Sequence, residues 1–336
     1  MDEVVKIVAQ IKAGEIKPIY FLMGEEPYYI DKIAEFMEQS ILNEQEKGFN
    51  QMVMYGKDVS METITSSAKR YPMMAERQVI IVKEAQHLSR VIDQIESYAL
   101  NPQPSTVLVF CYKHKKLDKR KKAYKAIAKN GYIFESKKLY ENQVAEWIRR
   151  ILSGKNYQIA PKAAQMLVEF LGNDLSRISK ELEKLQIVIP KGTEITPSHI
   201  EENIGISKEF NNFELRKAIG ERDVVKAAKI IQYFSQNPKD NPFVVTVSLL
   251  YSFFAQLLQY HGLKDQSRSA VASALRVNPY FVPEYQTAAR NYPMKRCSQI
   301  VSKLRQLDMK GKGVGATNMT QEDLLKELQL SIFNSY

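Results

Sequence analysis

Four short apolar runs, each followed by a segment with helical spacing, constrain the fold of the first 140 residues most strongly. The runs lie at 19–23, 51–55, 78–82 and 106–112, and a shorter one begins at residue 132. Nearly continuous apolar runs suit strands that are covered on both faces, as in a parallel sheet. Because helical segments separate the runs, the pattern predicts an α/β domain with a doubly wound parallel sheet.

From Glu141 onward the apolar residues recur at helical spacing, and we expect no further strand. Helices are expected at 141–153, 161–171, 173–187 and 196–204, and then in a series from 213 to 332, with a glycine-rich loop at 310–318. The aromatic residues Tyr251, Phe253, Phe254 and Tyr260 share one long helix and are expected to pack in its core. The spacing therefore predicts an α/β domain at 1–140, a small helical domain at 141–208 and a second helical domain at 209–336.

A glycine turn joins the first run to a helix expected at 30–42, which is where nucleotide-binding folds cradle phosphates. A working loop would need the pattern G-x-x-x-x-G-K-[ST], with the lysine on the β- and γ-phosphates and the hydroxyl on Mg²⁺. Here only the first glycine, Gly24, is present. Glu25 and Glu26 follow it and would repel an anion. The turn keeps the outline of a phosphate loop without its chemistry.

The third run supplies a second sign of a lost nucleotide site. It ends in Lys83-Glu84, where an ATPase would carry an aspartate that binds Mg²⁺. A lysine at that point would repel the metal ion. Since both halves of the site are missing, we expect no ATP hydrolysis and no catalytic residue.

Cysteine and histidine usage argues against a metal site. Cys111 and Cys297 lie far apart, and the four histidines lack zinc-binding spacing, so we expect no metal and no cofactor. We find no run of about 18 apolar residues and no signal-peptide pattern at the N-terminus. The sequence therefore predicts a cytoplasmic protein without a membrane span.

Two consecutive methionines stand between a helix expected at 60–69 and the third run, in the segment Pro72-Met73-Met74. Adjacent side chains cannot both point into one core, so at least one is expected to face solvent. Methionine adapts to many shapes and is common at protein-binding surfaces. The alternative is that the pair fills gaps at the edge of the core.

A basic segment at 113–125 holds eight Lys or Arg residues and one acid, within a chain of net charge +10. Much of it is expected to lie on a helix at 119–130. The candidate contacts to a nucleic-acid backbone are Lys115, Lys116, Lys119, Arg120 and Lys122. The alternative is a solvated helix face, because lysines pack their stems on the surface and leave their charge in water.

Several stretches of the chain together resemble the delta subunit of the bacterial DNA polymerase III clamp loader. They are 19–28 around Gly24, 72–82 from the methionine pair into the third run, Leu171-Gly172-Asn173-Asp174-Leu175 with Glu181-Leu182-Glu183-Lys184-Leu185, 212–219, and Leu307-Asp308 with Lys312-Gly313. Each motif is modest alone, but their order and spacing are specific, and together they span the chain.

The resemblance implies an AAA+-like α/β domain, a helical lid at 141–208 and a helical collar at 209–336 that joins the other loader subunits. It implies a subunit that binds the sliding clamp (beta subunit) and holds one ring interface open without hydrolysing ATP. Met73 and Met74 match the family's hydrophobic pair at the clamp, where Leu or Phe is often found. With Pro72 before them, they are the clamp-binding residues that the resemblance implies. The other implied partners are the delta-prime and gamma/tau subunits and primed DNA, within the polymerase holoenzyme at the cytoplasmic replisome.

Three alternatives differ from this interpretation. An active AAA+ ATPase would need a lysine near Gly24 and an acid at the end of the third run. A DNA-binding AAA+-like protein acting without a clamp would rely on the basic segment. The related delta-prime subunit usually carries a zinc-binding cysteine cluster, which two distant cysteines cannot form.

Overall fold

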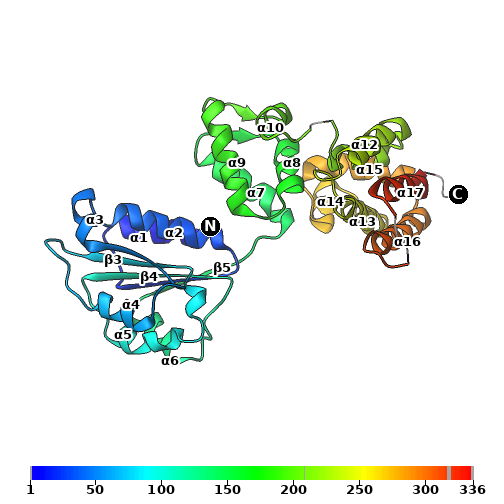
Figure 1. Ribbon diagram of the computed structural model, residues 1–336. Helices are drawn as coiled ribbons and strands as arrows, with labels where there is room; N and C mark the ends of the chain where they lie inside the picture. The colour runs from blue at the N-terminus through cyan, green and yellow to red at the C-terminus, as the bar shows by residue number, and fades with distance from the viewer. Residues whose placement is uncertain (1, 208, 316–318, 334–336) are drawn as a thin grey trace. The chain divides into compact units, whose positions relative to one another are not determined.

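The structure, a computed structural model, describes residues 2–207, 209–315 and 319–333 (Figure 1). Contacts group the chain into two compact units, residues 1–139 and 140–336, called here the N-terminal unit and the C-terminal unit. The first is built on a parallel sheet and the second is largely helical, which confirms the predicted fold class. The expected domain boundaries, including the division of the helical part at 208/209, stay predictions.

Five parallel strands form the sheet of the N-terminal unit in the order β2-β3-β4-β1-β5. They are β1 (Ile19–Gly24), β2 (Gln51–Tyr55), β3 (Gln78–Lys83), β4 (Thr106–Lys113) and β5 (Tyr132–Ser136). All of β1 is buried, because β1 lies inside the sheet and helices cover both faces. At its carboxyl end Gly24 pairs with Lys113 on one side and Ser136 on the other.

Helices cover the two faces of this sheet. The helices α1 (Asp2–Lys12) and α2 (Pro27–Ser40) lie over one face, and α4 (Met61–Ala68), α5 (Glu96–Leu100) and α6 (Lys122–Asn130) lie over the other (Figure 1). Two 3₁₀ turns, η1 (Ala85–Leu88) and η2 (Ile92–Ile95), follow β3. The strand side chains that face α4, α5 and α6 form one continuous apolar core with them.

Three helices of this unit differ from the prediction. The helix expected at 30–42 is α2, which begins at Pro27 after the Glu26 N-cap and ends at Ser40. A short helix, α3 (Glu44–Asn50), was missed because its sequence lacks apolar periodicity, although Asn43 and Glu46 form a capping box at its start. The helix expected from residue 119 begins only at Lys122. The Asp118 carboxylate accepts a hydrogen bond from the backbone N–H of Arg120 at 2.9 Å, and this local turn competes with the helix.

The C-terminal unit begins with four helices, α7 (Glu141–Ser153), α8 (Pro161–Leu171), α9 (Leu175–Val188) and α10 (Pro197–Ile204). Between them two short strands, β6 (Gln158–Ile159) and β7 (Glu194–Ile195), pair in parallel. The expectation of no strand after Glu141 was therefore wrong. Strands of two residues are too short to leave an alternating pattern in the sequence.

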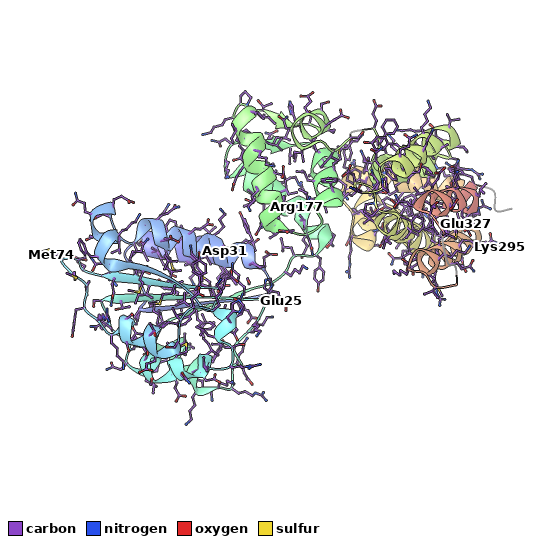
Figure 2. The ribbon with its side chains drawn as sticks, in the orientation of Figure 1. Glu25, Asp31, Met74, Arg177, Lys295 and Glu327 are labelled. Carbon is purple, nitrogen blue, oxygen red and sulfur yellow. The ribbon has the colours of Figure 1, made fainter. Side chains whose placement is uncertain are left out.

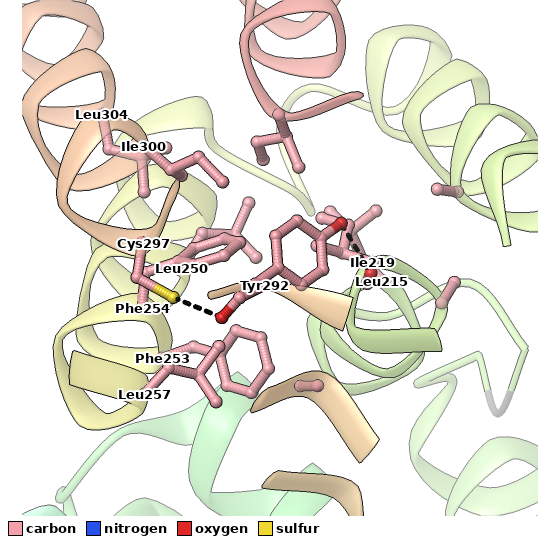
Figure 3. Close-up of a cluster of buried hydrophobic side chains, with 14 of the residues drawn as sticks. Leu215, Ile219, Leu250, Phe253, Phe254, Leu257, Tyr292, Cys297, Ile300 and Leu304 are labelled. Atoms are coloured by element: carbon pink, nitrogen blue, oxygen red, sulfur yellow. Dashed lines mark hydrogen bonds between the residues drawn. The ribbon is translucent and has the colours of Figure 1, made fainter. Parts of the chain in front are cut away.

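Among the described residues of this unit, seven further helices and one 3₁₀ turn follow. They are α11 (Asn212–Glu221), α12 (Val224–Gln236), α13 (Phe243–His261), α14 (Arg268–Leu275), η3 (Pro279–Phe281), α15 (Val282–Asn291), α16 (Met294–Gly311) and α17 (Gln321–Phe333). The loop expected at 310–318 lies partly outside the described residues. Figure 3 shows their core, where the Tyr292 hydroxyl donates to the Ile219 carbonyl at 2.9 Å and the Cys297 thiol donates to the Tyr292 carbonyl at 3.2 Å.

The central helix of this core is α13. It is the one described helix that is long and apolar enough to cross a membrane, a test that core helices of soluble proteins also pass. Phe253, Phe254 and Tyr260 are buried in the core, as expected. Tyr251 is 45% exposed, against the prediction. It follows the buried Leu250 by one residue, which rotates its side chain about 100° away from the core.

Candidate functional site

The turn after β1 is closed by the chain's own hydrogen-bond acceptors. The Gly24 N–H donates to the carbonyl of Lys115 at 3.1 Å, and the Glu25 N–H donates to the carbonyl of Ser136 at 3.1 Å. The Glu26 N–H donates to the Ser136 hydroxyl at 3.2 Å. A phosphate in such a loop is held by backbone N–H groups. All three N–H groups of this turn already have partners.

The end of β5 lies directly on this turn. Gly24 has a φ of +128°, and a Cβ built on it would collide with the backbone of Ser136. At the start of α2 the Glu26 carboxylate, 5% exposed, caps the helix by accepting from the Tyr28 N–H at 3.1 Å. This carboxylate occupies the helix terminus that would otherwise attract an anion. The turn is therefore filled as well as short of the expected lysine and hydroxyl.

Two lysines occupy the carboxyl edge of the sheet beside this turn. Lys83, at the end of β3, pairs with Glu38 at 2.9 Å. Lys113, at the end of β4, pairs with Asp31 at 2.9 Å and Glu84 at 2.6 Å. Burial works against the charge of Lys113, but hydrogen bonds to the two carboxylates outweigh it and raise its pKa. The edge that would need acids for Mg²⁺ is thus held together by internal ion pairs.

The methionine pair lies at the opposite edge of the sheet, because it precedes β3 whereas the filled turn follows β1 and all strands are parallel. Figure 2 shows Met74 at one end of the N-terminal unit and Glu25 at the other. Met73 as a residue is 63% exposed, and Met74, at 104%, is fully exposed. Pro72 is half-buried before them, and Tyr71 is exposed. The interpretation that these methionines fill the core edge is therefore wrong.

Sequence reasoning missed the residue that contacts this pair. Asn50, the last residue of α3, is buried, and its side chain hydrogen-bonds both the N–H and the carbonyl of Met73. It also missed Ser136, which closes the turn after β1. Neither residue stands in a motif, and each meets its partner from a distant part of the chain. Only the three-dimensional fold reveals them.

The basic segment carries mostly exposed charges that contact nearby groups of the same unit. Lys115, Lys116, Lys119 and Arg120 lie in the loop after β4, and Lys122 is the first residue of α6. Lys116 lies 3.1 Å from Glu135 and 3.3 Å from Glu25, and hydrogen bonds to these carboxylates raise its pKa. Arg120 pairs with Asp118 at 2.6 Å. Exposed ion pairs of this kind contribute little to stability. A role of these residues in binding DNA stays a prediction.

A groove of about 990 Å³ lies in the C-terminal unit, away from the sequence-predicted residues. Arg216 on its wall lies 4.0 Å from Glu169 and 3.6 Å from Glu284, and burial raises the pKa of both carboxyls. Arg216 thus lies between two carboxyls of its own unit. Among the described residues no group of three His, Cys, Asp or Glu side chains is arranged to hold a metal ion.

Together these features define a class of protein: a parallel α/β unit with a filled phosphate turn, followed by a largely helical unit. The family described as DNA polymerase III, delta subunit, matches residues 20–137, and its C-terminal domain matches residues 209–329. The DNA polymerase III subunit delta of Bacillus subtilis (strain 168) is 28% identical over 332 residues, covering 95% of this chain and 94% of that protein. The solved Bacillus subtilis DNA clamp loader delta protein (YqeN) is 25% identical, with a TM-score of 0.53 over 99% of this chain and 100% of that one. The chain belongs to the DNA polymerase III delta subunit family.

Proposed function

We propose that this chain binds the sliding clamp through Met73 and Met74 and favours the open form of the clamp ring. The observation that carries the proposal is the exposure of both methionines at one edge of the sheet, in a member of the delta subunit family. A solved relative is described as a clamp loader delta protein, which supports the same role. The chain acts as a non-catalytic component of the polymerase holoenzyme.

The chemistry of the pair suits docking into an apolar pocket. Burying one methionine side chain that was fully in water contributes roughly 1.5–3 kcal/mol. Met74 can gain most of this amount, since it is fully exposed before binding. Flexible thioether chains also adapt to a pocket of irregular shape. If both methionines fill a desolvated pocket, they can supply a large share of the binding free energy, as hot-spot residues do.

Ring opening follows from differential affinity. A protein that binds the open ring more tightly than the closed ring shifts the ring toward the open form by that difference in binding free energy. No hydrolysis in this chain is needed, which agrees with its filled turn and with lysines at the carboxyl edge. ATP on neighbouring subunits then controls when the methionine pair is accessible to the clamp.

The remaining parts take the family's arrangement in this proposal. Residues 1–140 form an AAA+-like domain, 141–208 a lid and 209–336 a collar that joins the delta-prime and gamma/tau subunits. The complex acts on primed DNA in the cytoplasm. Lys115, Lys116, Lys119, Arg120 and Lys122 are the candidate DNA contacts within it.

The test is calorimetry of the full chain with its own sliding clamp. Replacing both methionines (Met73→Ala with Met74→Ala) should weaken binding by about 2 kcal/mol or more, roughly 30-fold or more. Met294→Ala is the matched control, because this methionine is 48% exposed but belongs to the C-terminal unit. Unchanged affinity of the double variant would remove the pair from the proposal.

The nucleotide claim and the clamp-independent alternative need separate measurements. Clamp binding by the isolated chain should be the same with and without ATP, and micromolar ATP affinity would revive an ATPase function. A second candidate function, DNA binding without a clamp, is favoured by the net charge of +10. Tight DNA binding by the isolated chain that falls steeply with salt would support it.

A further inference from the structure

The backbone at the methionine pair adopts an unusual conformation. Met74 has a φ of +52°, in the left-handed region that residues with a Cβ rarely occupy. Its side chain extends into solvent and so contributes no packing that would hold this conformation. Strained residues of this kind persist only where the surrounding structure fixes them. The neighbouring contacts must therefore provide the restraint.

Asn50 supplies two hydrogen bonds at this point. Its Oδ1 accepts from the backbone N–H of Met73 at 2.7 Å, and its Nδ2 donates to the carbonyl of Met73 at 2.9 Å. Nδ2 also lies 3.2 Å from the carbonyl of Glu46, one turn earlier in α3. Satisfying the N–H and the C=O of one residue together is what a paired strand does in an antiparallel sheet. A side-chain amide here takes the place of a strand.

The two hydrogen bonds between Asn50 and the backbone of Met73, called here the bracket, start from a residue that is anchored in ordered structure. Asn50 is 5% exposed and ends α3, which starts in a capping box. The next residue, Gln51, begins β2 and pairs with Val79 of β3. Met73 is therefore fixed to the edge of the sheet rather than carried on an isolated loop.

We propose that Asn50 is a positioning residue for the methionine pair, holding the backbone of Met73 so that both side chains are presented to the partner. This inference rests on the proposed clamp-binding function of Met73 and Met74. A segment that is ordered before binding loses less conformational freedom when it binds, so the bracket raises affinity without touching the clamp.

The chemistry of this position suits asparagine. Its amide carries a donor and an acceptor on one planar group, which the N–H and C=O of Met73 both require. Asn50→Asp keeps an acceptor for the Met73 N–H but turns a second oxygen toward the Met73 carbonyl. Asn50→Ala removes both hydrogen bonds. The two variants therefore remove one half or the whole of the bracket.

Hydrogen exchange measured by NMR on the full chain, without the clamp, tests the bracket directly. In the wild type the Met73 N–H should be protected, and Asn50→Ala should speed its exchange by about tenfold or more, in line with the loss of a partly buried hydrogen bond. The amides of β3, such as that of Val79, should exchange as before. Asn50→Asp keeps the acceptor for this N–H and should therefore retain more of its protection than Asn50→Ala. Unchanged Met73 exchange in Asn50→Ala would overturn the inference.

A mutant cycle with the sliding clamp separates positioning from a general structural role. Asn50→Ala should lower clamp affinity by roughly 5- to 30-fold, the range expected when one or two hydrogen bonds of about 1 kcal/mol are lost. In the Met73→Ala, Met74→Ala background the same change should have no further effect, because the residues it positions are gone. An equal loss in both backgrounds would show that Asn50 does not act through the methionines.

The outcomes distinguish the two proposals. If the methionine double variant binds the clamp normally, the proposed function fails, whatever the exchange rate at Met73. If that double variant binds weakly but Asn50→Ala leaves clamp affinity unchanged, the positioning role alone is overturned.

Discussion

Replacing Gly24 by alanine should destabilise the N-terminal unit strongly. Alanine at a φ of +128° is strained by about 1–3 kcal/mol. Its Cβ would also meet the backbone of Ser136, so the end of β5 must move away. That movement breaks the hydrogen bonds from the N–H groups of Glu25 and Glu26 to Ser136, each worth about 1 kcal/mol. The sum is a loss of about 3–5 kcal/mol.

Two glycines of the same unit provide controls that separate these contributions. Gly14 has a φ of +79° with open space around its Cβ position, so Gly14→Ala measures backbone strain alone, about 1–2 kcal/mol. Gly48 lies in α3, also with open space, and alanine there should be neutral or stabilise by about 0.5–1 kcal/mol. A loss for Gly24→Ala that exceeds backbone strain alone, about 1–3 kcal/mol, reports the contact with β5.

The position of the tryptophan makes it possible to assign an unfolding transition to one of the two units. Its one tryptophan, Trp147, is buried in the C-terminal unit. In urea titrations, tryptophan fluorescence therefore follows that unit, whereas far-ultraviolet circular dichroism follows both. Unfolding of the N-terminal unit is followed by circular dichroism alone, and we expect Gly24→Ala to lower its urea midpoint. The urea midpoint followed by Trp147 fluorescence should not change. A loss no larger than that of Gly14→Ala would refute the packing of β5 on the turn.

Two further predictions concern the carboxyl edge and the thiols. Burial opposes ionisation of Glu84, but hydrogen bonds, foremost from Lys113, outweigh it and lower the Glu84 pKa below 4.5. Ionised Glu84 therefore contributes its full stabilisation at a pH above 4.5, and this contribution is lost as the pH falls through the pKa of Glu84 in the folded state. The difference in urea stability between wild type and Glu84→Gln should shrink from pH 7 to pH 3. Burial raises the pKa of Cys111 to about 12 and that of Cys297 to about 11. With Ellman's reagent at pH 8 the native chain should show almost no thiol reaction, and two thiols should react after unfolding in urea.

The strands and long helices could be predicted from the sequence because burial on both faces, or on one stripe, leaves a clear pattern. The strand at 51–55 and the helices at 141–153 and 161–171 have the expected bounds. Elements fixed by single polar contacts could not be predicted in this way. The helix α3 and the late start of α6 depend on capping and on the Asp118 turn rather than on apolar spacing.

The candidate site was predictable in part for a similar reason. The absence of the lysine and the hydroxyl near Gly24 can be read directly from the sequence, and so can the adjacency of Met73 and Met74. The contacts made by Ser136 and Asn50 are not, because each joins segments that only the fold brings together. Local sequence therefore indicates which groups are absent or exposed, and tertiary contacts determine what fills the turn and what holds the pair.

The left-handed backbone of Met74 also limits which amino acids can stand at that position. Asn and Asp tolerate positive φ better than other residues with a Cβ, whereas Val, Ile and Thr add crowding next to the main chain and are true outliers there. Leucine and phenylalanine branch only at Cγ and methionine is unbranched, so they crowd the main chain less than Val, Ile or Thr. Exchanging Met74 for leucine or phenylalanine therefore changes the shape of the side-chain tip without the added backbone crowding of a β-branched residue, so that the strength of a contact can be tuned without rebuilding the loop.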